Sequence, residues 1–157
     1  MMSLPPVLPV VAVRYGPFDP AGLTCHRSPE ESHLAVAAPA WLARYGKDPQ
    51  AWPAQERLRH SDTPWPERIG RGARLKAAEG MECNDAALIL AAARAELGVA
   101  WTRRRLAAQD LAEGRLTVVP GSEIPAGRSY SLAYRSELSG HPAVAAFRDW
   151  LLPILEA

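Results

Sequence analysis

The chain has 157 residues, 48% of them apolar, which suffices for one ordinary core or two small lobes but not for two large independent domains. Its 18 basic and 17 acidic side chains nearly cancel. The resulting formal charge of +1 gives no broad electrostatic surface for nucleic acid or an acidic membrane, so we expect no direct nucleic-acid binding by this chain.

The cysteines and the apolar runs indicate in which cellular compartment the protein is expected. Cys25 and Cys83 are the two cysteines, and their wide spacing fits a reducing compartment better than a disulfide-stapled secreted domain. A single disulfide between them is the alternative. The longest uncharged apolar run, residues 86–93, is far shorter than the ~20 residues that span a bilayer. We therefore expect a soluble cytoplasmic protein with no membrane segment.

The first third of the chain predicts a strand, a loop, a second strand and a helix. Residues 10–13 form a short β-rich run that leads into a loop rich in Pro and Gly. Residues 34–38 form a second apolar run. Pro39 then stands near the start of a short helix, and Gly46 lies just beyond its end.

The segment 47–80 is rich in Pro, Arg and Trp and has the weakest pattern. It suggests a short strand at 58–60 and a helical turn at 65–69. The tryptophans lack the interleaved basic residues of a nucleic-acid stacking surface, so we interpret them as core residues. They stand at positions 41, 52, 65, 101 and 150.

Strands and helices alternate from residue 81 to residue 119. The pattern predicts strands at 81–83, 97–101 and 115–119, with helices at 86–95 and 103–112 between them. Asn84 is expected to cap the first helix, and Thr102 to cap the second. This alternation implies a mainly parallel sheet with helices on its faces.

After a Pro/Gly-rich link at 120–127, the chain is expected to end in one more strand and helix. Residues 129–135 alternate as a strand does, and Pro142 stands where a helix begins. Pro153 should kink or end that helix, because proline lacks the amide that would bond to the carbonyl of Asp149.

Searches for catalytic and metal-binding motifs find none. The sequence has no serine-hydrolase elbow, no P-loop, no dinucleotide-binding glycine pattern and no H-E-x-x-H metal helix. The four histidines lack ligand spacing and are better interpreted as surface, loop or capping residues than as metal ligands. The run 103–105 (Arg-Arg-Arg) could contact phosphates, but a solvated helix face is the favoured interpretation. We expect neither an enzyme nor a metal or cofactor site.

One junction is a candidate ligand site. Asn84 and Asp85 start a helix directly after a strand, and such junctions lie at the carboxyl edge of a parallel sheet, where small ligands bind beside free helix N–H groups. Asp85 would oppose an anion and prefer a donor or a cation. A purely structural role, with Asn84 as a cap and Asp85 as a dipole partner, explains the same residues equally well.

Several segments, in order, resemble the effector domain of LysR-type transcriptional regulators, especially the glycine-cleavage and β-lactamase activators. The resemblance covers nearly the whole chain after about residue 10. Its blocks are VAVRYG at 11–16, VAAPAWL at 36–42, HSDTPW at 60–65, NDA at 84–86 with AAA at 91–93, LGVA at 97–100, DLAEGRL at 110–116 and AVAAFRDWLL at 143–152.

The resemblance implies an α/β fold of the type 2 periplasmic-binding-protein kind, with two lobes and a small-molecule effector in the cleft between them. Residues of about 15–119 would form the whole second lobe, and residues of about 125–157 would return to the first lobe, which would be only partial. Residues 1–9 are expected to be irregular. The helix-turn-helix through which the family binds DNA, and the first half of the first lobe, have no counterpart here, which suggests a truncated regulator.

By position in the family, the effector-binding candidates are Asn84, Asp85, Tyr130 and Arg14. The sequence departs from the family pattern at Val10, where the crossing strand usually begins with Asp, and at Glu96, where the helix usually ends in Gly. A left-handed conformation at Glu96 would cost about 1 kcal/mol. The leading hypothesis is an effector-sensing part of a LysR-type regulator that forms a homo-oligomer. The alternative is an interaction module that pairs with itself or with an intact regulator.

Overall fold

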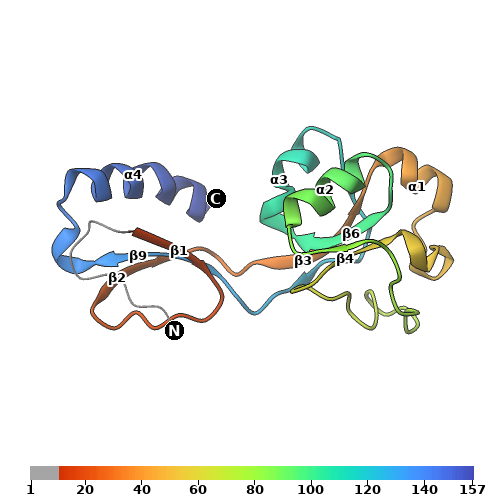
Figure 1. The fold of residues 1–157 in the computed structure, drawn as a ribbon, viewed down its shortest axis with the longest axis horizontal. Coiled ribbons are helices and arrows are strands. Elements are labelled where there is room, and N and C mark those ends of the chain that lie inside the picture. The colour runs from red at the N-terminus through yellow and green to blue at the C-terminus, as the bar shows by residue number, and fades with distance from the viewer. Residues whose placement is uncertain (1–10) are drawn as a thin grey trace. The chain divides into compact units, whose positions relative to one another are not determined.

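The computed structural model describes residues 11–157, and their chain divides into two compact units (Figure 1). Unit 1 combines residues 11–31 with residues 126–157, and unit 2 consists of residues 32–125. The predictions for residues 1–9 and for Val10 lie outside the described residues. Among residues 11–157, no helix is both long and apolar enough to cross a membrane.

Unit 1 is a three-stranded antiparallel sheet with one helix on it. Strand β9 (Tyr130–Arg135) lies in the middle, between β1 (Val11–Tyr15) and β2 (Leu23–Arg27). Helix α4 (Pro142–Glu156) lies over one face of this sheet, as Figure 1 shows. The buried side chains between sheet and helix are those of Leu132, Tyr134, Val144 and Leu155.

Two features of unit 1 differ from the expectations. Residues from about 15 onward were expected in the second lobe, whereas β2 pairs with β9 and lies in unit 1. Of the two effects expected of Pro153, a kink or an end of the helix, the second does not occur, because α4 continues to Glu156. Because Pro153 lies in the last turn, the amide it lacks removes only one hydrogen bond near an end that frays in any case.

Unit 2 is built on one mixed sheet. Its strands are β3 (Ser32–Ala37), β4 (Arg57–His60), β5 (Glu82–Cys83), β6 (Val99–Arg103), β7 (Thr117–Val118) and β8 (Ile124–Pro125). The order across the sheet is β5-β4-β6-β3-β7, and β8 also pairs with β3.

The α/β class is confirmed, but the prediction of a mainly parallel sheet is wrong. Strand β4 pairs in parallel with β5 and β6, whereas β3 runs antiparallel to β6, β7 and β8. Alternation of strands and helices indicates only that each helix returns the chain across the sheet. The alternation does not specify which strand lies beside which in the sheet, and β3 lies antiparallel to β6.

Three helices pack around this sheet: α1 (Pro39–Tyr45), α2 (Ala86–Arg94) and α3 (Arg104–Ala112), with 3-10 turns at Pro49–Ala51 and Ala54–Glu56. Strand β3 is buried on both faces. Leu34 and Val36 pack in one cluster with α2 and α3, and Ala35 and Ala37 pack in a second cluster. Figure 1 shows α2 and α3 on one side of the strands and the long segment after β4 on the other.

The second cluster contains most of the tryptophans. Trp41, Trp52 and Trp101 are buried, and Trp65 joins them through ring contacts with Trp52 and Trp101. The prediction of core packing is therefore confirmed for these four, whereas Trp150 on α4 is 62% exposed. The helical turn expected at 65–69 does not form, and Trp65 instead donates from its indole nitrogen to the Leu58 carbonyl at 2.7 Å.

Candidate effector site

The parallel strands of unit 2 bring several loop residues to one sheet edge. Strands β4, β5 and β6 point the same way, so their carboxyl ends share that edge. Helix α2 begins just after β5, and α3 follows β6 directly. Two helix N-termini, with their unsatisfied N–H groups and positive dipole ends, therefore lie at the edge where α/β sheets bind ligands.

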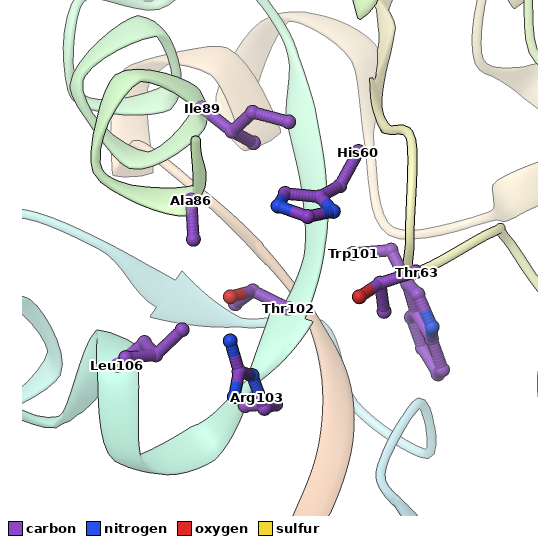
Figure 2. A pocket seen from close by; sticks show the side chains of 8 residues that line it. All are labelled: His60, Thr63, Ala86, Ile89, Trp101, Thr102, Arg103 and Leu106. Atoms are coloured by element: carbon purple, nitrogen blue, oxygen red, sulfur yellow. The ribbon is translucent and has the colours of Figure 1, made fainter. Parts of the chain in front are cut away.

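A depression lies at this edge, and Figure 2 shows the side chains that surround it. Its lining residues are His60, Thr63, Ala86, Ile89, Trp101, Thr102, Arg103 and Leu106. The enclosed space is only about 10 Å³, which is about the room that one water molecule needs. Unit 2 by itself therefore offers an open wall of side chains at this edge and not a pocket that encloses a metabolite.

The polar groups of this wall come from the ends of β4 and β6. His60 accepts a hydrogen bond through Nδ1 from the Asp62 amide at 3.0 Å, so a neutral ring carries its proton on Nε2. Thr102 is 5% exposed, and Figure 2 shows its side chain between those of His60 and Arg103. These groups can donate hydrogen bonds to an acceptor on a ligand.

The start of α3 carries three consecutive arginines, of which Arg104 is firmly paired. Its guanidinium donates twice to the Glu123 carboxylate, at 2.5 and 2.7 Å, and Ser32 donates to the same carboxylate at 2.6 Å. The hydrogen bonds from Arg104 and Ser32 lower the pKa of Glu123 to about 2. Positive charge at a helix N-terminus opposes the dipole, and Glu123 compensates it at Arg104.

The structure places Asn84 and Asp85 at this edge but exchanges their expected roles. Asp85, not Asn84, is the N-cap of α2, and its carboxylate accepts from the Ala87 amide at 2.8 Å. Helix α3 is likewise capped one residue later than predicted, at Arg103, because β6 continues past Thr102. For α3 the cause is strand pairing, because Arg103 still pairs with His33 of β3 and a cap forms only where that pairing stops.

Arg14 and Tyr130 lie in unit 1, on neighbouring strands. Arg14 is opposite Ser131 in the register, and Tyr15 is opposite Tyr130 with ring centroids 4.8 Å apart. Tyr130 packs against the cluster under α4. The four candidates thus lie in separate units, Asn84 and Asp85 together in unit 2, and Arg14 and Tyr130 in unit 1 on opposite faces of the sheet.

No group of three or more metal-ligating side chains occurs among residues 11–157. His141 caps α4 by accepting from the Ala143 amide, and His26 contacts the Tyr134 hydroxyl at 3.0 Å.

The family model for the LysR substrate binding domain matches residues 11–155. The chain belongs to that family.

Solved structures of LysR-type regulators resemble this LysR substrate-binding domain. The regulatory domain of CrgA from Neisseria meningitidis matches with a TM-score of 0.70 at 18% identity, over 92% of this chain and 74% of the CrgA domain. The effector domain of AmpR from Pseudomonas aeruginosa matches with a TM-score of 0.69 at 23% identity, over 92% of this chain and 71% of that domain. The effector-binding domain of AmpR from Citrobacter freundii matches with a TM-score of 0.67 at 19% identity, over 92% of this chain and 74% of that domain.

The likeness confirms the type 2 periplasmic-binding-protein-like fold. Against the longer structure of CrgA, 94% of this chain matches, with a TM-score of 0.71 and 18% identity, but only 52% of that chain is covered. The domain thus spans about half the length of that regulator. No curated protein matches the chain.

The sequence analysis did not select His60, Thr63, Thr102 or Arg103 of the LysR substrate-binding domain as site residues. A signal for the first two was present, because the HSDTPW block at 60–65 resembles the family and directly follows a strand. Thr102 and Arg103 were assigned to a helix start, and only the pairing of β6 with β4 brings them beside His60.

Proposed function

We propose that this LysR substrate-binding domain is the effector-sensing part of a transcriptional regulator, that it binds a small metabolite, and that it has no DNA-binding surface of its own. The family match over residues 11–155 is the observation that carries the proposal. The sequence blocks quoted above support the subgroup of glycine-cleavage and β-lactamase activators, and that resemblance also supports a cytoplasmic location.

The wall at the carboxyl edge of unit 2 is the proposed contact surface for the effector. Asn84 and Asp85 stand at the start of α2, and the hydroxyl of Thr102 opens beside the start of α3. Because the polar side chains of this wall, among them His60, Thr102 and Arg103, offer N–H and O–H donors beside apolar neighbours, a ligand that presents hydrogen-bond acceptors and some apolar surface suits it. Arg14 and Tyr130 remain proposed contributors from unit 1.

A screen of common metabolites by thermal unfolding tests the proposal, because a ligand that binds only the native state raises the unfolding temperature by mass action. For a metabolite that binds, Thr102→Val should weaken binding about tenfold, since it replaces a hydroxyl with a methyl of the same shape. Thr117→Val on exposed β7 is the matched control and should leave binding unchanged. If no metabolite in the screen stabilises the domain, effector sensing by this chain is contradicted.

Self-association is the second part of the proposal. Large apolar side chains lie exposed on both units, among them Trp150, Leu97 and Leu88. Exposed apolar surface of this kind favours contacts between copies. Light scattering should therefore report a homo-oligomer, and a monodisperse monomer at all concentrations would contradict this part alone.

A further inference from the structure

A second, larger hollow lies in unit 1. It is open, with a volume of about 320 Å³, and its lining residues are Arg27, Glu30, Gly127, Arg128, Ser129 and Ser131. This volume is at the lower end of small-molecule sites. The hollow is formed by the end of β2 with the turn after it and by the segment that leads into β9.

Strand register fixes which face of the sheet the hollow occupies. Ser131 on the middle strand lies opposite Arg27 of β2, and on its other side it lies opposite Arg14 of β1. Directly opposed residues in an antiparallel pair share a face. Tyr130 and Leu132 alternate to the other face, where they pack in the cluster under α4. The hollow therefore lies on the face away from α4, with Ser131, only 3% exposed, at its base.

The charges around the hollow do not cancel. Glu30 accepts a hydrogen bond from the Gly127 amide at 2.7 Å, which holds its carboxylate against the backbone. Within residues 11–157, neither Arg27 nor Arg128 forms an ion pair. The side chain of Arg128 lies along Gly16, where an added Cβ would stand 3.6 Å from its Cδ. Two guanidinium groups thus face one engaged carboxylate.

We propose that this hollow binds a small oxyanion, either a carboxylate or a phosphate group, between Arg27 and Arg128. A guanidinium presents paired N–H donors whose fork matches the oxygens of both anions, and the serine hydroxyls add further donors. The bound anion neutralises the excess positive charge. It also joins segment 27–30, after which the chain enters unit 2, to segment 127–131, by which the chain has returned to unit 1.

This site is separate from the effector wall proposed in unit 2, although Arg14, a proposed effector contributor in unit 1, lies opposite Ser131 at the base of the hollow. The wall is made of residues of unit 2, and all six residues of the hollow belong to unit 1. Loss of one activity therefore does not imply loss of the other, and each can be tested on the full chain with its own variants.

The test is a titration of the full chain with sodium phosphate and, in a second arm, with sodium acetate. Binding is monitored by the NMR chemical shifts of the backbone amides and the arginine side chains. Sodium chloride at equal ionic strength is the reference. We expect saturable shifts at Gly127, Arg128, Ser129 and Ser131, and the arm with the tighter binding identifies the anion. Arg27→Gln or Arg128→Gln should weaken binding about tenfold each, because each removes one charge-assisted contact.

A double variant provides the decisive comparison. R27Q/R128Q should abolish the saturable shifts, whereas the charge-matched control K47Q/R71Q, which changes two exposed cations of unit 2, should retain them. Dispersed spectra of each variant establish that it folds. Shifts that equal those in chloride, or shifts that persist in R27Q/R128Q, would overturn the proposal.

Discussion

Glu96 ends helix α2 in a left-handed conformation, with φ of 64°. The Glu96 amide donates to the Ala93 carbonyl and the Leu97 amide to the Ala92 carbonyl, each at 3.0 Å. These two bonds form a Schellman motif, in which the left-handed position usually carries glycine. The left-handed conformation considered for Glu96 is therefore present, and the backbone accepts strain here to close the helix.

We predict that Glu96→Gly stabilises the domain by about 1 kcal/mol, because glycine enters the left-handed region without a Cβ clash. The Arg44–Glu96 ion pair that is lost is exposed at both ends and offsets little of the gain. Urea unfolding measures the change. Ala95→Gly, at a right-handed position one residue earlier, is the control and should not stabilise; a loss of stability in Glu96→Gly would refute the prediction.

The cap of α2 allows a second test at the scale of single residues. Asp85→Ala should lower the free energy of unfolding by about 1 kcal/mol, because the Ala87 amide loses its acceptor. Asn84→Ala should change it by less than about 0.5 kcal/mol, because Asn84 is exposed and precedes the cap. Equal effects of both changes in urea unfolding would mean that the cap is not fixed at Asp85.

At the scale of elements, Asp110 joins α2, α3 and the approach to β7. Its carboxylate accepts from Arg94 near the end of α2 and from Arg115 ahead of β7, each at 2.8 Å. Its carbonyl accepts from the amides of Arg115 and Leu116. Burial raises the pKa of Asp110, but the hydrogen bonds from Arg115 and Arg94 outweigh it, and the pKa lies below its usual value.

We predict that Asp110→Ala lowers the free energy of unfolding by about 1–3 kcal/mol at neutral pH. A carboxyl whose pKa is lower in the folded state stabilises above its unfolded pKa of about 3.9 and loses that effect as the pH falls through the folded value. The difference between wild type and variant should therefore shrink below about pH 4 in unfolding curves. Asp149→Asn, on the exposed side of α4, is the control, and a difference independent of pH would contradict this account.

Elements with their own local signals were predicted well, whereas strands that depend on a distant partner were missed. Helix α1 has Pro39 at its start and Gly46 at its end, and both signals lie in the sequence. Strand β2 was not among the predicted strands, and its residues are all half-buried or exposed, so no buried apolar run marks it in the sequence. Its pairing with β9, more than 100 residues away, is what makes it a strand.

The whole molecule has separate cores in its two units. Leu132 lies at the centre of the cluster under α4 in unit 1, and Leu34 lies in the cluster against α2 and α3 in unit 2. Both side chains are fully buried. Because no core cluster among residues 11–157 contains residues of both units, the two units should respond separately to damage in one core.

We predict that Leu132→Ala costs about 2–5 kcal/mol and lowers hydrogen-exchange protection in β1, β2 and β9, while β3 and β6 keep theirs. Leu34→Ala should show the reverse pattern. Equal loss of protection in both units for either variant would show that they unfold as one cooperative body.

For the candidate site, as for the fold, residues with a local sequence signal could be predicted, and residues brought together by strand pairing could not. The start of α2 follows a strand, so Asn84 and Asp85 could be selected from the sequence alone. His60 and Thr102 are 42 positions apart, and they line one wall only because β4 and β6 pair side by side and in parallel. No local pattern encodes that pairing.

The sequence by itself determined the family, the α/β class and the helices, because ordered blocks, caps and helical periodicity are local properties of the chain. Only the tertiary structure decided that β3 runs against its neighbours, that Asp85 and not Asn84 caps α2, and that Arg27 and Arg128 line one hollow. Strand pairing connects residues that are distant in sequence, and the packing of both faces of a sheet selects among pairings that look alike locally.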